Sequence, residues 1–232
     1  MNFEYDMILY FLFILAIILT FYAQYKVSST FKKYSRIRTG RGQTAAEAAR
    51  MILNANGLYH VKIERVGGNL TDHYDPRSEV LRLSDSVYDS TSAAAVGVAA
   101  HEAGHAVQHA VGYLPIKLRS KLVPITNFAS KSTWILILIG AFMYYSDFGY
   151  MLVMLGIALF SVTTLFQLVT LPCEFDASNR AMSELRRSGW YTNQELVASR
   201  RVLSAAALTY VASLLVSVLQ LLRLLARYSR RR

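Results

Sequence analysis

The sequence is poor in cysteine, proline and acidic residues. Among 232 residues there are one cysteine and four prolines, and 15 Asp and Glu stand against 25 Lys and Arg. A single cysteine excludes a secreted scaffold held together by disulfides. Charged residues make up 17% of the chain, against roughly 25% in soluble domains, while hydrophobic residues reach 53%. So apolar a composition also excludes a disordered chain, which would require low hydrophobicity.

The apolar residues gather in four long runs. Three of them contain no charged residue, namely Met7–Tyr25, Phe148–Cys173 and Val202–Leu222, and the run from about Ile125 to Tyr145 has only Lys131 near its start. A helix needs about 20 apolar residues to cross a bilayer. The sequence therefore predicts a mainly α-helical integral membrane protein, with an N-terminal transmembrane helix in residues 1–25, a helical hairpin in 121–172, and a hydrophobic helix with a basic tail in 202–232.

Basic residues flank these runs unevenly. The segment from Lys26 to Arg41 carries six Lys and Arg and no acid, and further basic residues precede the second run. Because Lys and Arg favour the cytoplasmic side, the polar stretches are expected in the cytoplasm and the runs in the plasma membrane. The last run is ambiguous, because five arginines follow it, at positions 223, 227, 230, 231 and 232. It either crosses, which we favour, or lies on the membrane surface or against the other spans.

The polar stretches predict a small α+β domain. Residues 44–57 begin with a capping-box pattern and end in glycine, which is typical of a short helix. Alternating apolar and polar residues predict short strands at 59–66 and 79–84. A helix with almost no charge is expected from Ala93 to about Val111, and its low charge indicates that it is buried.

That buried helix contains the sequence His101-Glu102-Ala-Gly-His105. Two histidines four residues apart share one helical face and can bind the same metal ion. Glu102 points about 100° away around the helix and can reach a water on that metal as a general base. Burying these polar groups without a ligand would be costly, so a metal site is favoured over a purely structural role.

The third metal ligand is less obvious. His109 continues the spacing, but it lies about 12 Å from His101 along a straight helix and cannot converge on the same ion. His60 and His73 are alternatives in strand or loop segments. Glu174 is the better candidate, because a carboxylate suits zinc and because it follows the third apolar run at the predicted start of a helix.

The order of these motifs resembles that of the membrane metallopeptidases of the HtpX and CAAX-prenyl-protease superfamily. There the motif helix is followed by two spans and a glutamate ligand, as in residues 174–180 here, Glu-Phe-Asp-Ala-Ser-Asn-Arg. Over nearly the whole chain, including residues 70–76 and 206–212, the sequence resembles the narrower YugP-like family of bacterial neutral zinc metallopeptidases. The resemblance implies a gluzincin-like fold in which one zinc ion is held by His101, His105 and Glu174. The superfamily's aspartate, which orients a zinc-binding histidine, aligns with Ser178, so Ser178, Asp176 or another carboxylate is expected to replace it.

With this resemblance, residues 26–120 and 173–201 are expected to form the two parts of a zincin-like catalytic domain, a short sheet plus the motif helix. The expected activity is a membrane-embedded zinc endopeptidase that cleaves membrane or membrane-proximal proteins with zinc-activated water and Glu102 as base. The peptide is expected to pair with an edge strand, and a polar group is expected to stabilise the oxyanion. The strand residues are Val80, Leu81, Arg82 and Leu83, and the oxyanion candidates are His73, Tyr74 and Arg180.

Other function classes remain as alternatives. A proteolytically inactive membrane adaptor could use zinc only to hold its domain together. A channel or carrier is disfavoured, because the apolar runs lack ionisable residues near their midpoints. Nucleic-acid binding is not expected, because attraction to anionic lipid accounts for basic residues beside the runs. The expected partners are a protein or peptide substrate and membrane lipid.

Overall fold

The computed structural model describes residues 3–143 and 145–228, and most of them are helical. The chain divides into two compact units, which we describe separately. The first unit consists of residues Met1–Tyr22, Leu118–Leu171 and Thr209–Arg232, and the second of Ala23–Lys117 and Pro172–Leu208.

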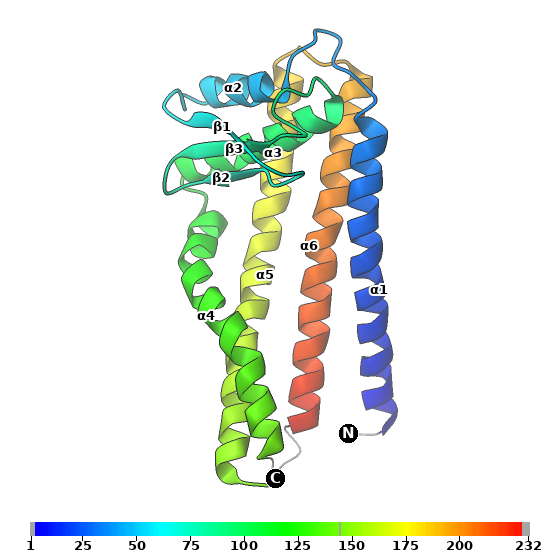
Figure 1. The fold of residues 1–232 in the computed structure, drawn as a ribbon, viewed down its shortest axis with the longest axis vertical. Coiled ribbons are helices and arrows are strands. Elements are labelled where there is room, and N and C mark those ends of the chain that lie inside the picture. The colour runs from blue at the N-terminus through cyan, green and yellow to red at the C-terminus, as the bar shows by residue number, and fades with distance from the viewer. Residues whose placement is uncertain (1–2, 144, 229–232) are drawn as a thin grey trace. The chain divides into compact units, whose positions relative to one another are not determined.

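Four long helices account for the apolar runs (Figure 1). They are α1 (Phe3–Tyr34), α4 (Leu114–Phe142), α5 (Asp147–Arg187) and α6 (Asn193–Tyr228). In the described part of the chain, these four helices are long and apolar enough to cross a membrane. Residues 193–227 contain no Gly or Pro, and α6 runs through them without a break.

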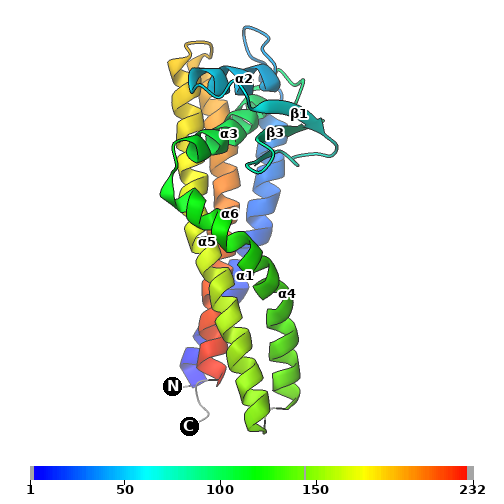
Figure 2. The ribbon, with the colours of Figure 1, turned by 90° about the vertical axis from the view of Figure 1, so that its left-hand side faces the viewer.

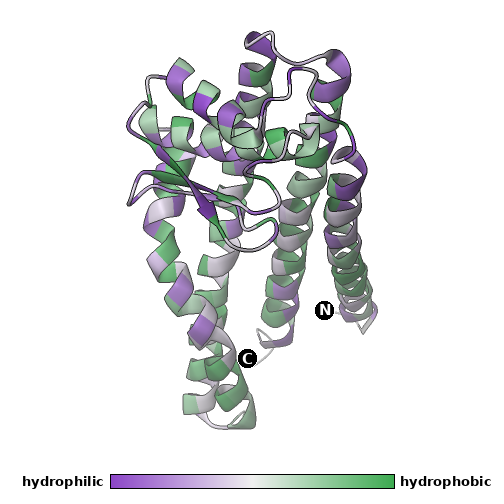
Figure 3. Cartoon of the chain, turned by 45° about the horizontal axis from the view of Figure 1, so that its top comes forward, coloured by the Kyte–Doolittle hydropathy of each residue, from purple (hydrophilic) through white to green (hydrophobic). Residues whose placement is uncertain are grey.

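Inside the first unit, α4 and α5 lie side by side (Figure 2). Buried residues of α4, α5 and α6 share a small cluster, Ile137, Val153, Ile157, Phe160, Leu224 and Tyr228. Most other apolar side chains of this unit face outward, and Figure 3 shows hydrophobic residues along the long helices. Phe142, for example, is 84% exposed. An exposed apolar surface of this extent marks a site of contact with a membrane or with another protein.

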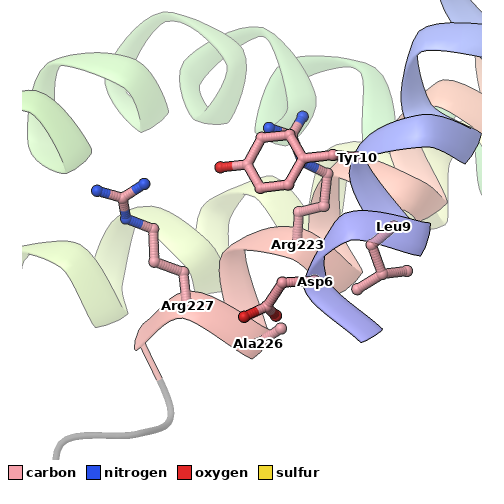
Figure 4. Close-up of a pocket in the computed structure, with 6 residues that line it drawn as sticks. All are labelled: Asp6, Leu9, Tyr10, Arg223, Ala226 and Arg227. Atoms are coloured by element: carbon pink, nitrogen blue, oxygen red, sulfur yellow. The ribbon is translucent and has the colours of Figure 1, made fainter. Parts of the chain in front are cut away.

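In the first unit, α6 runs antiparallel to α1. Leu219 and Ala226, near the end of α6, share a cluster with Leu9 and Ala16, near the start of α1. The guanidinium of Arg223 lies 3.9 Å from the centre of the Tyr10 ring (Figure 4). At this distance the ring attracts the guanidinium through a cation–π interaction. The last apolar run thus packs against another candidate span. The three arginines at 230–232 lie outside the described residues.

The second unit contains a three-stranded sheet and two shorter helices. The capping box predicted for α2 (Ala45–Ala55) is confirmed, because Thr44 and Glu47 exchange hydrogen bonds of 2.8 and 3.2 Å. The strands are β1 (Lys62–Val66), β2 (His73–Asp75) and β3 (Val80–Ser84). The two predicted strands are confirmed, although β1 begins three residues later than expected. β2 is too short to show a sequence alternation.

The sheet order is β1-β3-β2, which makes β3 the central strand. β1 pairs with it in parallel along its whole length, and β2 pairs antiparallel with Val80–Arg82. Beyond β2, the amide of Ser84 donates to Asp72 Oδ1 at 2.7 Å. The expectation that Val80, Leu81, Arg82 and Leu83 form a free edge for the substrate is therefore wrong. The strand that contacts the motif helix on that side of the sheet is β2.

The motif helix is α3 (Ala93–Ala110), and the Ser92 hydroxyl caps its first turn. Its alanine-rich surface lies in the main core of the second unit together with Ile52, Leu81, Leu83 and Leu185. The expectation that a helix begins after Pro172 is wrong, because α5 runs through this proline without ending. Proline removes one backbone donor from the helix, yet α5 continues on both sides of it. One uninterrupted helix therefore contributes the third apolar run and Glu174.

Candidate metal centre

The structure brings together His101 and His105 of α3 and Glu174 of α5. Their ligand atoms all lie within 4.8 Å of one another. Glu174 Oε2 is 3.1 Å from His101 Nε2 and 3.6 Å from His105 Nε2. Two ligands of a tetrahedral zinc ion, each about 2.0–2.1 Å from the metal, lie roughly 3.4 Å apart. The two observed separations fall on either side of that value.

The close approach of α3 and α5 depends on Gly104. A Cβ atom at this position would lie 2.6 Å from the carbonyl oxygen of Ala177. Gly104 lies between the two histidines in α3, and Ala177 lies three residues after Glu174 in α5. Glycine at position 104 therefore allows the backbones of the two helices to come into contact beside the ligands. Glu174 is 2% exposed and His105 is 8% exposed, so the ligand atoms are shielded from bulk water.

The ring of His101 has a supporting contact on its other nitrogen. His101 Nδ1 lies 3.1 Å from Ser178 Oγ, one turn after Glu174. Ser178 and Glu174 share a face of α5, as the i,i+4 spacing predicts. Ser178, which the resemblance expects to replace an aspartate, thus contacts His101 directly. It holds the ring with Nε2 towards Glu174 and adds no charge.

The ring of His105 is held by Gln108. Gln108 Oε1 lies 2.9 Å from His105 Nδ1, and Gln108 Nε2 donates to the carbonyl of Cys173 and to Asp176 Oδ2, each at 2.8 Å. Because both partners of Nε2 are acceptors, the amide orientation is determined, and Oε1 must accept from the Nδ1 proton of His105. The Nε2 lone pair of His105 then faces Glu174 and is available to a metal.

Sequence reasoning missed Gln108. It is fully buried, and a fully buried amide must find partners for all its polar atoms. The available signal was a polar residue three positions after His105 on a helix that is otherwise almost wholly apolar. The identity of its partners could not be read from the sequence, because Cys173 and Asp176 lie 65 and 68 residues away.

Asp176 supports the site indirectly. Its Oδ2 accepts from Gln108 and also from Arg180 Nε, at 2.6 Å. The Arg180 guanidinium lies 5.8 Å from the centre of the Tyr113 ring. Asp176 therefore fixes the amide that orients His105, whereas Ser178 contacts the other histidine directly. Ser178 and Asp176, the two predicted supporting residues, therefore act on different histidines: Ser178 on His101, and Asp176 through Gln108 on His105.

Glu102 lies beside the ligands and is half-buried. Its Oε2 accepts a hydrogen bond of 3.1 Å from the backbone amide of Tyr74 in β2. The Tyr74 N–H thus points away from β3, so Tyr74 presents its backbone on the free edge of β2 next to Glu102. In an antiparallel pair, alternate residues face outward in this way.

The three oxyanion candidates differ in what they can donate. His73 Nδ1 lies 2.9 Å from the Thr71 carbonyl oxygen, which can only accept, so the neutral ring has no proton left on Nε2. Arg180 donates its Nε–H to Asp176 and has further N–H groups that can donate elsewhere. The Tyr74 ring lies 5.7 Å from the ring of His109, and burial raises the pKa of its hydroxyl, which stays protonated. Arg180 and Tyr74 are therefore better donors than neutral His73.

Two aspartates fix the ends of β2. Burial raises the pKa of Asp72 against the opposing effect of hydrogen bonds from Ser84. Hydrogen bonds donated by Ser78 and the Arg77 amide lower the pKa of Asp75 to about 2. These bonds anchor the short strand on both sides of Tyr74.

The other histidines considered from the sequence lie outside the ligand cluster. His60 pairs with Glu79, with 3.6 Å between the closest atoms, and His109 lies against Tyr74. Among the described residues, the group of metal-binding side chains is His101, His105 and Glu174. Two imidazoles and a carboxylate are zinc ligands, and the two rings are oriented by uncharged partners, so the donor set fits zinc.

Comparisons with known proteins also indicate zinc. Residues 9–229 match the family described as "Putative neutral zinc metallopeptidase". The chain is 49% identical over 217 residues to a protein of Bacillus subtilis (strain 168) named "Putative membrane protease YugP", covering 94% of this chain and 95% of that protein. No solved structure matches the chain.

Proposed function

The chain belongs to the neutral zinc metallopeptidase family, and on that premise we propose that it is a membrane-embedded zinc endopeptidase. The observation that carries the proposal is the convergence of His101, His105 and Glu174, with Glu102 beside them. We assign the three clustered residues as ligands of one zinc ion and Glu102 as the general base. This ligand set is of the gluzincin type.

Zinc bound at this site would lower the pKa of a water molecule towards neutrality and polarise the scissile carbonyl. Glu102 accepts the proton of the attacking water and returns it to the leaving amine. Ser178 and Gln108 keep the two imidazoles in the orientation that presents Nε2 to the metal. Arg180 and the Tyr74 hydroxyl are the candidates for stabilising the oxyanion.

The substrate is expected to lie extended along β2. Tyr74 offers outward backbone groups on this edge, and its amide already contacts Glu102. A peptide that adds to the sheet here would displace that contact and leave the Glu102 carboxylate available for the attacking water. The edge is only three residues long, so it aligns a short stretch of the peptide on either side of the scissile bond.

We further propose that the catalytic domain is zincin-like, is built from residues 26–120 and 173–201, and faces the cytoplasm. The basic residues after the first apolar run support this orientation. The four long helices would then cross the plasma membrane, with both ends of the chain on the opposite side. Substrates would be membrane or membrane-proximal proteins, because Glu174 directly follows the third apolar run.

The test is Glu102→Gln in the purified, zinc-loaded protein, with β-casein as a general substrate. Loss of a general base typically costs about 10²–10⁴-fold in rate. We expect a loss of cleavage in this range with one zinc per chain retained. The matched control is Glu64→Gln, an exposed glutamate on β1, which should leave the rate unchanged.

Three outcomes would overturn the proposal. Full activity of Glu102→Gln would refute the role of the base. Zinc bound away from His101, His105 and Glu174, located by anomalous scattering at the zinc edge, would refute the site. A zinc-loaded wild type that cleaves neither β-casein nor any peptide of a diverse library would favour the inactive adaptor.

A further inference from the structure

A polar cavity lies in the second unit, between α1 and α6. It is lined by the cations Lys26, Lys33 and Arg201, the hydroxyls of Thr30 and Ser204, and Tyr34. Its volume is about 410 Å³, within the range of roughly 300–1,000 Å³ typical of ligand sites. The proposed catalytic role uses none of these residues.

The lining follows the helical periodicity on both helices. Lys26, Thr30 and Lys33 are spaced by four and three residues on α1, and Arg201 and Ser204 by three on α6. Residues at such spacings share one face of a helix, so each helix presents its cations and hydroxyl to the same cavity. Lys26, Lys33, Arg201 and Ser204 are exposed, and Thr30 and Tyr34 are half-buried.

The charge around this cavity is of one sign. No carboxylate is among its lining residues in the described part of the chain. The sequence has no acid between Asp6 and Glu47, or after Glu195. Three cations that line one cavity repel one another, and a bound anion would relieve this repulsion. Lysine, arginine and hydroxyl groups together are the donors that bind phosphate through charge-assisted hydrogen bonds.

The position of the cavity along α1 favours a lipid phosphate over a free ion. Lys26 directly follows the apolar run Met7–Tyr25. At 1.5 Å per residue, Thr30 lies about 7.5 Å beyond Tyr25, which is comparable with the roughly 5–8 Å depth of a headgroup layer. A lipid with its chains beside the apolar run would have its phosphate at the level of these donors. Basic pockets between helices at this depth bind anionic headgroups.

We propose that this cavity binds the phosphate headgroup of one anionic phospholipid and that the lipid links α1 to α6. The two lysines and Arg201 neutralise the phosphate, and Thr30 and Ser204 donate hydrogen bonds to its oxygens. The site is separate in sequence from the metal ligands. None of the lining residues is among the metal ligands, and we expect the lipid to bind with or without zinc.

The test is native mass spectrometry of the full chain released from micelles that contain equal amounts of phosphatidylglycerol and phosphatidylcholine. The wild type should retain one phosphatidylglycerol. The triple variant Lys26→Gln/Lys33→Gln/Arg201→Gln should bind it at least tenfold more weakly. The matched control, Lys32→Gln/Arg36→Gln/Arg200→Gln, removes the same charge from exposed neighbours that do not line the cavity, and it should bind like the wild type.

Equal weakening in both triple variants would overturn the proposal, because it would mean diffuse attraction between basic flanks and lipid. Equal retention of phosphatidylcholine by the wild type would also overturn it. Displacement of the lipid by millimolar inorganic phosphate would assign the cavity to a free anion instead. Circular dichroism and zinc content report folding of each variant. If the triple variant does not fold, the pair Arg201→Gln and Arg200→Gln provides the same comparison.

Discussion

The two units of the chain differ in the hydrogen bonds of their buried polar side chains. In the first unit, several hydroxyls of the long helices bond within their own helix, as Thr164 does to the carbonyl of Phe160 at 3.1 Å, while the buried hydroxyls of Thr126 and Thr133 have no hydrogen-bond partner in the described part of the chain. In the second unit, side-chain hydrogen bonds join distant elements, as Gln108 of α3 does to Cys173 and Asp176 of α5. The first pattern needs only a helix, whereas the second needs one particular arrangement of helices. The proposed catalysis therefore depends on the second unit, and the first unit is expected to tolerate more substitutions.

The apolar residues show the same contrast. Ile52, Leu53, Leu81 and Leu83 in the second unit are fully buried. In the first unit, Phe21 is 73% exposed and Phe142 is 84% exposed. In the proposed membrane setting this apolar surface faces lipid, and helix length and hydropathy then matter more than exact side-chain packing.

The largest effect should come from removing a ligand. Glu174→Ala leaves two imidazoles and should weaken zinc binding by more than the roughly 10–100-fold typical of losing a supporting contact. Thr164→Ala on the same helix removes a hydroxyl bonded only to its own backbone and should leave zinc binding unchanged. Zinc affinity is measured by competition with a chelator. Equal effects of the two substitutions would contradict the contrast between the units.

Gln108→Leu should weaken zinc binding about 10–100-fold, because His105 loses the acceptor that orients it and Asp176 loses a donor. The matched control is Thr170→Val, which removes a hydroxyl that bonds to the Phe166 carbonyl within α5. We expect chelator competition to separate these two variants clearly. Unchanged zinc affinity of Gln108→Leu would show that Gln108 does not support metal binding.

Gly104→Ala should destabilise the second unit by about 1–3 kcal/mol, because its Cβ would lie 2.6 Å from a backbone oxygen of α5. Gly156→Ala makes an equally close contact in the first unit, with the Ile137 side chain. Thermal melts in detergent should show destabilisation in both variants. Only Gly104→Ala should also lower zinc affinity, and loss of zinc in Gly156→Ala would show that the units are coupled.

The smallest effect is expected at Asp75. The pKa of this carboxyl is lowered from its usual value of 3.8 to about 2, so its stabilising contribution is present above pH 4 and is lost as the pH falls through 2. Asp75→Asn should lower the melting temperature by about 1–2 °C at pH 6, because charged contacts that are partly open to water contribute little. The difference from the wild type should vanish near pH 2. A difference that is constant with pH would exclude the carboxylate as its cause.

Much of the fold could be predicted because it depends on local patterns. The four apolar helices follow from runs of uncharged residues, and the capping box of α2 follows from Thr44 and Glu47. The expectation of a helix start at Pro172 was wrong, because proline is tolerated inside α5 although it lacks an amide donor. The edge-strand expectation was wrong because strand order depends on pairings that the alternation of β3 does not encode.

The four apolar helices, the pair His101 and His105 and the position of Glu102 could be predicted from local patterns, because spacing along one helix sets which residues share a face. Three features became visible only in the folded chain: Gln108 orients His105, β2 rather than β3 offers the free edge, and α1 and α6 share a basic cavity. These features depend on contacts between residues far apart in the chain. Such contacts are selected by the packing of whole elements, as at Gly104, and no local periodicity specifies them.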